Sequence, residues 1–352
     1  MKKLSKKFIP LSLAGAMVLA MTGCSSSSGG ENGELNLFIW TEYIPESVID
    51  SFEEDTGIKV NMSTYSSNED MLAKVKSESE GAYDVIVPSD YMVELMSQQG
   101  LLEELDKDKL DNLDNLNEAY LGASYDPENT YSVPYLGGVA AIAVNTKNVD
   151  IDIDSYDDLF DPSLKNSIVA LDDYRAVIGM TARSMGYSMN ETDTTKLSEI
   201  EEKLLTIKDN ISLYDSDSPK SAMISGDASV GYMWSAEIAL AMEENPDIDV
   251  VYPTEGAYLF MDNLSIPKGD KNYDNAMKFI DYVLDGDTMA DIASEFPYLM
   301  PNKVALEKLG DDYANNKAKN PPAEVIENGE YIQNLDTDVL SIYDKMWTNL
   351  NN

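Results

Sequence analysis

Histidine is absent from this chain of 352 residues, and cysteine occurs only once, as Cys24. Zinc and other transition-metal sites therefore lack their usual imidazole and thiolate ligands. A histidine-dependent triad, a cysteine nucleophile and an intrachain disulfide are excluded for the same reason. Glycine loops that bind phosphates or dinucleotides are missing as well. We therefore expect a protein without a metal and without another cofactor.

Basic residues are scarce. The chain has 25 Lys and Arg against 64 Asp and Glu, a net charge of −39. The first 23 residues contain four of the lysines and no acid, so the chain after them has 21 basic residues and a net charge of −43. The acids are spread along the chain, which is typical of a solvated surface. This charge excludes nucleic acid as a partner and favours the approach of cations.

The amino-terminal residues are predicted to direct export. Lysines precede an apolar run from Phe8 to Met21, which is too short for a membrane span. The sequence MTGC follows and resembles a lipobox, in which the cysteine becomes the lipidated first residue of the mature protein. We predict a lipoprotein signal peptide at 1–23, lipid on Cys24 and a flexible tether at 24–33. The alternative is an ordinary signal peptide with an incidental cysteine.

Hydrophobic patterns alternate between strand and helix along the rest of the chain. This alternation indicates a largely parallel sheet with helices on both faces. A first unit ends near residue 98, and a second covers about 168–252. The predicted elements are strand 35–39, helix 46–56, strand 59–65, helix 68–79, strand 83–89, helix 91–98, strand 168–171, a helix from Ala176, helix 194–205, strand segments at 211–215 and 228–235, and helices 273–284, 287–293 and 337–350.

Two segments interrupt the alternation. Residues 131–146 contain Pro and Gly and are predicted to form a pair of strands, and 256–269 has the pattern of a second crossing. The chain is long for one core and suited to two. We predict an α/β protein of two lobes with a cleft between them. The strand ends of each sheet are expected to face that cleft, because ligands of α/β sheets bind there.

The residues at these strand ends are mostly aromatic or acidic. Buried carboxylates need a cationic partner. Aromatic rings attract ammonium groups by roughly 0.5–2 kcal/mol each. A linear polyamine, with charged ends and an apolar middle, suits both features. The residues are Trp40, Thr41, Glu42, Tyr43, Ser89, Tyr91, Asp172, Asp173, Trp234, Phe260, Asp262, Tyr298 and Gln333.

Seven sequence blocks, taken in order, make the chain similar to a known family. It resembles the spermidine/putrescine-binding proteins of bacterial ABC importers over essentially the whole mature chain. The blocks are WTEYIP (40–45), TGIKV (56–60), STYSSNEDM (63–71), YDVIVPSDYMV (83–93), VPYLGG (133–138), MDNLSIP (261–267) and YLMPN (298–302).

The resemblance implies a periplasmic-binding-protein-like fold of type II that closes on its ligand at hinge crossings. The N-terminal lobe would comprise 34–139 and 261–307, and the C-terminal lobe 140–260 and 308–352. It implies a monomeric extracytoplasmic receptor, not an enzyme, that delivers a polyamine to a permease and its ATPase. The implied ligand contacts are Trp40, Thr41, Glu42, Tyr43, Ser89, Tyr91, Asp173, Trp234, Phe260, Asp262, Tyr298 and Gln333.

The chain departs from the family pattern at three positions. Ala176 stands where many relatives have a glutamate, which favours a dication such as putrescine over spermidine. Glu237, one turn beyond Trp234, is a candidate to compensate. Phe260 stands where some relatives have tryptophan. Asp90 adds an acid to the PSDY motif, and we interpret it as a helix N-cap.

Other interpretations of the same residues remain open. The tryptophans and tyrosines suit core packing, and Glu42, Ser89 and Asp172 suit helix starts. The functional alternatives are the same scaffold tuned to another solute, a hydrolase with Asp173 and Glu42 as its carboxylates, and a surface adhesin or sensor. No acid/base pair has a motif of its own, which weakens the hydrolase hypothesis.

Overall fold

The computed structural model describes residue 30 and residues 32–352. The predicted signal peptide, Cys24 and most of the predicted tether lie outside the described residues. The end of that tether is bound to the body of the protein. The Asn32 N–H donates to the Gly57 carbonyl (3.1 Å), and the Lys59 N–H donates to the Gly33 carbonyl (3.0 Å). Residues 32 and 33 of the predicted tether therefore belong to the folded body.

The first unit is a parallel α/β structure, as its pattern predicts. The apolar strand β1 lies between β2 and β3 and is parallel to both. Helix α1 ends at Gly57, whose positive φ of 69° suits glycine. The elements are β1 (Glu34–Trp40), α1 (Glu46–Thr56), β2 (Lys59–Tyr65), α2 (Asn68–Ser77), β3 (Val85–Ile86) and α3 (Asp90–Gln98).

Strand β3 is much shorter than the predicted strand 83–89, which was wrong in its extent. The carbonyl of Val87 accepts hydrogen bonds from the Trp40 indole (2.8 Å) and the Tyr65 hydroxyl (2.5 Å). Because side chains occupy this carbonyl, the ladder ends before Pro88. The bond from the indole fixes Trp40 at the end of β1.

The prediction of two strands at 131–146 was wrong, because one strand, β4 (Ser132–Asn145), covers the segment. Its neighbour β9 (Tyr258–Ser265) is antiparallel, and the register shifts between Pro134 and Leu136. The glycines that suggest a turn allow close packing instead. A Cβ at Gly137 would lie 2.6 Å from Met261 Cε, and one at Gly138 would lie 2.9 Å from Phe260 Cζ.

The second unit is also parallel at its centre, where β5 pairs with β6 and β7. Its first helix begins at Tyr174, two residues before the predicted start. The elements are β5 (Ile168–Ala170), α4 (Tyr174–Ser184), α5 (Thr194–Leu204), β6 (Ile211–Tyr214), α6 (Lys220–Ser225), β7 (Val230–Trp234), α7 (Ser235–Glu244) and β8 (Ile248–Val251).

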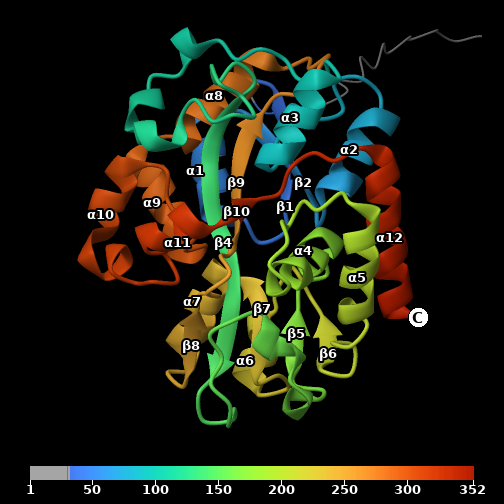
Figure 1. The fold of residues 1–352 in the computed structure, drawn as a ribbon. Helices are drawn as coiled ribbons and strands as arrows, with labels where there is room; N and C mark the ends of the chain where they lie inside the picture. The colour runs from blue at the N-terminus through green and yellow to red at the C-terminus, as the bar shows by residue number, and fades with distance from the viewer. Residues whose placement is uncertain (1–29, 31) are drawn as a thin grey trace, which may run out of the picture.

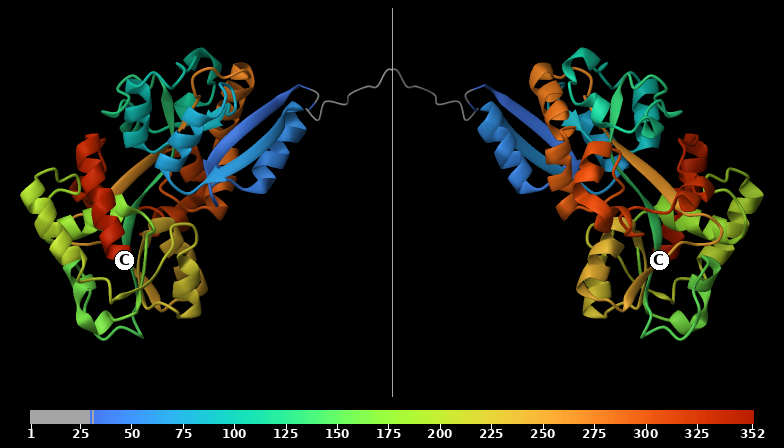
Figure 2. Two further views of the ribbon diagram at one scale, coloured as in Figure 1. Left: turned by 90° about the vertical axis from the view of Figure 1, so that its right-hand side faces the viewer. Right: turned by 90° about the vertical axis from the view of Figure 1, so that its left-hand side faces the viewer.

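The expectation of two separate sheets was wrong, because the strands of both units join one sheet. The order is β2-β1-β3-β9-β4-β7-β5-β6, with β10 (Glu330–Tyr331) on β9 and β8 on β4. Figure 1 shows β4 and β9 running from the upper lobe into the lower one. The side views in Figure 2 show the two lobes inclined to each other.

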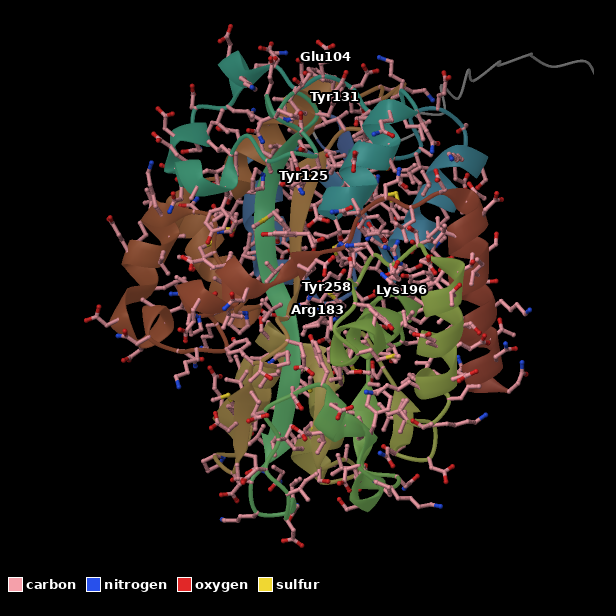
Figure 3. All side chains as sticks on the ribbon, viewed as in Figure 1. Glu104, Tyr125, Tyr131, Arg183, Lys196 and Tyr258 are labelled. Carbon is pink, nitrogen blue, oxygen red and sulfur yellow. The ribbon has the colours of Figure 1, made fainter. Side chains whose placement is uncertain are left out.

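The remaining helices cover both lobes. Helices α8 and α9 pack beside β1 and α1, and α12 packs on α4 and α5. Figure 3 shows side chains with oxygen or nitrogen ends around the whole outline. Among the described residues no helix has the length and apolar character that crossing a membrane requires. These helices are α8 (Tyr273–Val283), α9 (Gly286–Glu295), α10 (Lys303–Ala314), α11 (Ala323–Asn328) and α12 (Thr337–Asn351).

Candidate functional site: a cavity lined by rings and carboxylates

A cavity of about 260 Å³ lies between the lobes, and eleven of the twelve predicted contact residues line it. Six carboxylate residues and nine aromatic residues belong to its wall, and none of the lining residues is Lys or Arg. The predicted residues that line it are Trp40, Thr41, Glu42, Tyr43, Ser89, Tyr91, Asp173, Trp234, Phe260, Asp262 and Tyr298.

Asp262 forms one end of this cavity. Its Oδ2 accepts a hydrogen bond from the Tyr43 hydroxyl (2.6 Å), and its Oδ1 accepts one from the Ser89 hydroxyl (2.5 Å). Asn68 fixes Ser89 in turn, because its amide nitrogen donates to Ser89 Oγ (3.0 Å). The groups that hold Asp262 are therefore neutral. No lysine or arginine of the described chain pairs with it.

Burial decides the protonation behaviour of this end. Desolvation raises the pKa of Asp262 to about 7, although the hydrogen bonds from Ser89 and Tyr43 lower it. Burial, followed by the charge of Asp262, raises the pKa of Tyr43 well above its usual 10, so Tyr43 remains a donor. A buried carboxylate with only neutral partners is poised to take up a cation.

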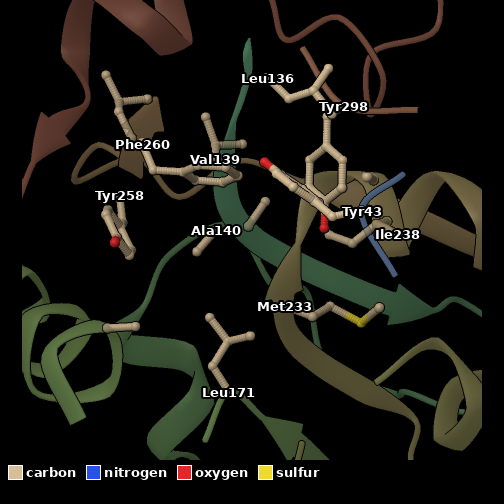
Figure 4. Packing of buried hydrophobic residues seen from close by; sticks show 14 of the residues in the cluster. Tyr43, Leu136, Val139, Ala140, Leu171, Met233, Ile238, Tyr258, Phe260 and Tyr298 are labelled. Carbon is tan, nitrogen blue, oxygen red and sulfur yellow. The ribbon is translucent and has the colours of Figure 1, made fainter. Parts of the chain in front are cut away.

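Aromatic rings form the walls beside Asp262. The Trp234 ring centroid lies 5.2 Å from that of Phe260, and those of Tyr43 and Tyr298 are 5.1 Å apart. Figure 4 shows Tyr43 and Tyr298 together, with Phe260 and Tyr258 nearby. Tyr258, two residues before Phe260 on β9, also lines the cavity and is absent from the predicted set. Its alternation with Phe260 along a strand is the sequence signal that identifies it.

Asp173, which follows β5, also lines the cavity. Its Oδ1 accepts the backbone N–H groups of Arg175 (2.8 Å) and Ala176 (3.0 Å), so it caps α4. The interpretation of Asp172 as the helix start was wrong; Asp172 is exposed. No side chain or backbone group in the described residues donates to Asp173 Oδ2. Burial raises the pKa of Asp173, against the lowering effect of the N–H groups and Arg175.

Glu69 lines the cavity within the electrostatic range of Asp173 and was missed from the sequence. Its Oε1 accepts a hydrogen bond from the Tyr91 hydroxyl (3.2 Å). Desolvation, followed by the charge of Asp173, raises the pKa of Glu69. Residues 66–69 follow β2, so the rule applied to the other strand ends would have found them. The guanidinium of Arg175 lies 6.0 Å from the Tyr91 ring centroid, outside the cavity wall.

The proposed compensation by Glu237 does not agree with the structure. Glu237 does not line the cavity, and both of its carboxylate oxygens accept from Lys220 Nζ at 2.9 Å. The same ammonium donates to Glu42 Oε2 (3.0 Å). Glu42 has a positive φ of 52° in the turn after β1, and its side chain is 48% exposed. One of the predicted ligand carboxylates is thus already paired.

The structure places Gln333 away from this cavity. Its carbonyl accepts from Arg175 Nη2 (3.0 Å), and its N–H donates to Asn190 Oδ1 (2.8 Å). Gln333 lines a second cavity of about 360 Å³ together with Asp90. Asp90 is the first residue of α3 rather than its N-cap, and its Oδ2 accepts the Met261 N–H (3.0 Å). It therefore ties α3 to β9.

Residues 47–322 match the family of bacterial extracellular solute-binding proteins. The chain belongs to this family. The spermidine/putrescine-binding periplasmic protein of Salmonella typhimurium is 38% identical over 351 residues, which is 99% of each chain.

Two solved structures are similar to this solute-binding protein. A putative spermidine/putrescine ABC transporter protein from Listeria monocytogenes is 35% identical with a TM-score of 0.87 and covers 90% of this chain and 98% of its own. A lipoprotein of Treponema pallidum is 28% identical with a TM-score of 0.81 and covers 90% of this chain and 99% of its own. The two-lobed fold of the periplasmic substrate-binding proteins is therefore shared.

The residue types of the cavity limit what it can hold. No group of three or more His, Cys, Asp or Glu side chains in the described part of the chain is arranged to hold a metal ion. The carboxylates instead lie at separate points around a wall of rings. This arrangement suits an organic cation with more than one charged group.

Proposed function

We propose that this chain is an extracytoplasmic receptor for a linear polyamine, putrescine or spermidine, which it delivers to a membrane-embedded ABC permease and its ATPase. The ligand lies between the two lobes, with ammonium groups at Asp262 and Asp173. Its methylene chain passes between rings that include Trp234 and Tyr298. No covalent chemistry is involved.

One observation carries this proposal. Asp262 is 4% exposed, its partners are hydroxyl groups, and no base lines the cavity around it. A buried ionised carboxylate without a cation is costly, and a ligand ammonium removes that cost. The rings next to Asp262 add cation–π attraction, which favours an ammonium over a neutral hydrogen-bonding group. The names of the Salmonella and Listeria relatives support the same ligand class.

Closure of the lobes is the proposed mechanism of capture. The lobe boundaries predicted at 139/140 and 260/261 fall within β4 and β9, the strands that connect the lobes. Asp262 and Tyr43 belong to one lobe, and Asp173 and Trp234 to the other. A ligand that contacts both sets favours the closed form, because only that form provides every contact.

The proposal also covers where the protein is located and its oligomeric state. The receptor acts as a monomer outside the cytoplasm, held to a membrane by lipid on Cys24. The Treponema relative is a lipoprotein, which supports an anchor of this kind. Palmitate labelling of the wild type and of Cys24→Ser, followed by membrane fractionation, tests this part. Equal labelling of both chains would contradict it.

The hydrolase alternative fits the geometry less well. Glu42 is bound to Lys220, and Asp173 Oδ1 is bound to the start of α4. Neither carboxylate faces the other as an acid and a base. The solute-binding family to which the chain belongs acts in transport, which also favours a receptor over an enzyme.

Isothermal titration calorimetry tests the polyamine proposal. The exported protein is unfolded and refolded to remove ligand carried over from the cells. Putrescine, spermidine and spermine are titrated separately, with lysine and maltose as controls. Saturable one-to-one binding of a polyamine, at micromolar affinity or tighter, is expected. Absence of binding with all three polyamines would contradict the proposal and direct the search to other cationic solutes.

A further inference from the structure

Lys220 is an internal cation next to the proposed ligand site. Its Nζ lies 2.9 Å from each carboxylate oxygen of Glu237, 3.0 Å from Glu42 Oε2 and 3.1 Å from Ser218 Oγ. Its side chain is 20% exposed and that of Glu237 is 6% exposed. Every donor direction of the ammonium is occupied by these contacts.

Lys220, Glu237 and Glu42 stabilise one another in their charged forms. Burial favours the neutral amine, but the attraction of Glu237 and Glu42 outweighs it and raises the pKa of Lys220 above its usual value. Lys220 is therefore an ammonium at neutral pH. Burial raises the pKa of Glu237, while Lys220 lowers it. Without Lys220, a buried carboxylate would have no cation beside it.

This cluster adjoins the cavity across the interlobe gap. Glu42 follows β1 in one lobe and lines the cavity, whereas Lys220 and Glu237 lie on α6 and α7 in the other (Figure 1). Burial raises the pKa of Tyr298 in the cavity wall, and the charges of Glu237, Asp262 and Glu42 raise it further. Tyr298 thus lies within the field of both the Asp262 end and the Lys220 cluster.

The balance of charge around the cavity follows from these contacts. Lys220 supplies one cation to the pair Glu42 and Glu237, so the three groups together carry a single negative charge. Asp262 has only hydroxyl partners, and Asp173 has one oxygen without a donor. Ala176, fully buried on α4, supplies no carboxylate. Of the six wall carboxylates, Glu42 alone forms an ion pair within the described chain, so Lys220 occupies one anionic contact that a ligand ammonium could otherwise use.

We propose that Lys220 is a specificity-determining residue that occupies the place of a third ligand ammonium and so favours a diamine over a triamine. This inference rests on the proposed polyamine-binding function. A triamine whose third ammonium approaches Glu42 and Glu237 meets a pair that already holds a cation. It either leaves that ammonium unpaired or has to displace Lys220 from a buried partner, and both are unfavourable.

The variant Lys220→Met tests the inference, because it removes the ammonium and retains an apolar stem. We expect the ratio of the putrescine Kd to the spermidine Kd to rise at least tenfold over that of the wild type, since Glu42 and Glu237 become free to bind an amine. Lys220→Arg keeps the charge and should leave the ratio within twofold. Lys319→Met is the matched control, because Lys319 pairs with Glu243 (2.6 Å) elsewhere on the surface.

A double variant separates specificity from folding. Lys220→Met combined with Glu237→Gln leaves no unpaired buried charge, so it should fold even where the single variant does not. Its ratio should return most of the way to the wild-type value. Adding Glu42→Gln should lower the ratio further, because it removes the last carboxylate that the loss of Lys220 sets free. If no single or combined change at these positions moves the ratio while polyamines still bind, the inference is wrong.

The same titrations distinguish this inference from the proposed function. Failure of the wild type and of every variant to bind any polyamine overturns the proposed function, and the role of Lys220 with it. Normal binding with an unmoved ratio overturns the role of Lys220 alone. Tighter spermidine binding in Lys220→Met, reversed by Glu237→Gln, supports both.

Discussion

The Tyr43 hydroxyl and the Asp262 carboxylate, 219 positions apart in the sequence, form a buried hydrogen bond of 2.6 Å. This bond joins the turn after β1 to the middle of β9. It orients the carboxylate toward the cavity and leaves it without a permanent cation. Burial raises the pKa of Asp262 and this bond opposes the rise, while Tyr43 gives the carboxylate a neutral partner in place of a cation.

Asp262→Asn should weaken polyamine binding at least tenfold, because an ammonium loses its buried anionic partner. The ligand-free variant should be more stable than the wild type at pH 8, by about 1–3 kcal/mol, since no buried carboxylate has to be ionised. Titration calorimetry and urea unfolding at pH 8 measure the two effects. Unchanged affinity would contradict the site assignment and leave the fold unaffected.

The pH dependence of stability follows from the same group. Its folded-state pKa of about 7 lies above the usual 3.8, so the unfolded chain releases the proton first as the pH rises. The stability contributed by Asp262 is complete below about pH 4 and lost as the pH rises through about 7. The stability difference between Asp262→Asn and the wild type should therefore grow from pH 5 to pH 8. A difference that stays constant would contradict the raised pKa.

Ligand affinity should show the opposite pH dependence. Binding of an ammonium requires ionised Asp262, so the Kd should rise as the pH falls below about 7, by up to about tenfold per pH unit. Titrations at pH 5, 6, 7 and 8 in constant ionic strength measure the slope. Asp262→Asn, which has no carboxyl group at this position, should give a flatter profile. Equal slopes for the two proteins would assign the effect to another group.

Trp234→Ala should also weaken binding at least tenfold. The indole packs edge-on against Phe260 and Tyr258, and its removal opens the cavity wall to water. Trp234→Phe, which keeps a ring, should recover most of the affinity. Calorimetry on both variants measures the loss, and near-UV circular dichroism checks that the fold is retained. Equal affinity of Trp234→Ala and the wild type would exclude this ring from the site.

Ala176→Glu should shift selectivity toward spermidine. The structure indicates that the substitution also lowers the stability of the folded protein. Ala176 is completely buried and its carbonyl accepts from the Tyr232 hydroxyl (3.3 Å), so a glutamate there is desolvated. We expect a fall of about 1–3 kcal/mol in the ligand-free free energy of unfolding. Spermidine should raise the Tm of the variant more than that of the wild type. The same Tm shift in both would show that this position does not set the choice.

The predictability of the fold differs from strand to strand. The bounds of α1 and β2 agree with the sequence pattern, because Pro45, Gly57 and alternating apolar residues are local signals. The continuity of β4 was not predictable from the same signals. Its Gly137 and Gly138 resemble turn residues, but their role is the close approach of Phe260 and Met261, which are distant in sequence.

In the site, too, residues marked by a local sequence pattern were predictable, and residues whose contacts are distant in sequence were not. Strand ends followed by aromatic or acidic residues located most of the cavity wall. Lys220 has no local signal, since its partners Glu42 and Glu237 lie 178 and 17 positions away. Gln333 was included both as a strand-end residue and by resemblance, but its contacts with Arg175 and Asn190 depend on packing that no motif encodes.

The passage of β4 and β9 through both lobes has a mechanical consequence. These strands hydrogen bond to β3 at one end and to β7 at the other, so each lobe completes its sheet with backbone that also belongs to its neighbour. If either lobe unfolded, β4 and β9 would lose the backbone hydrogen bonds that they form with the strands of that lobe. We therefore expect the two lobes to unfold as one cooperative unit, with the slowest-exchanging amides in these two strands.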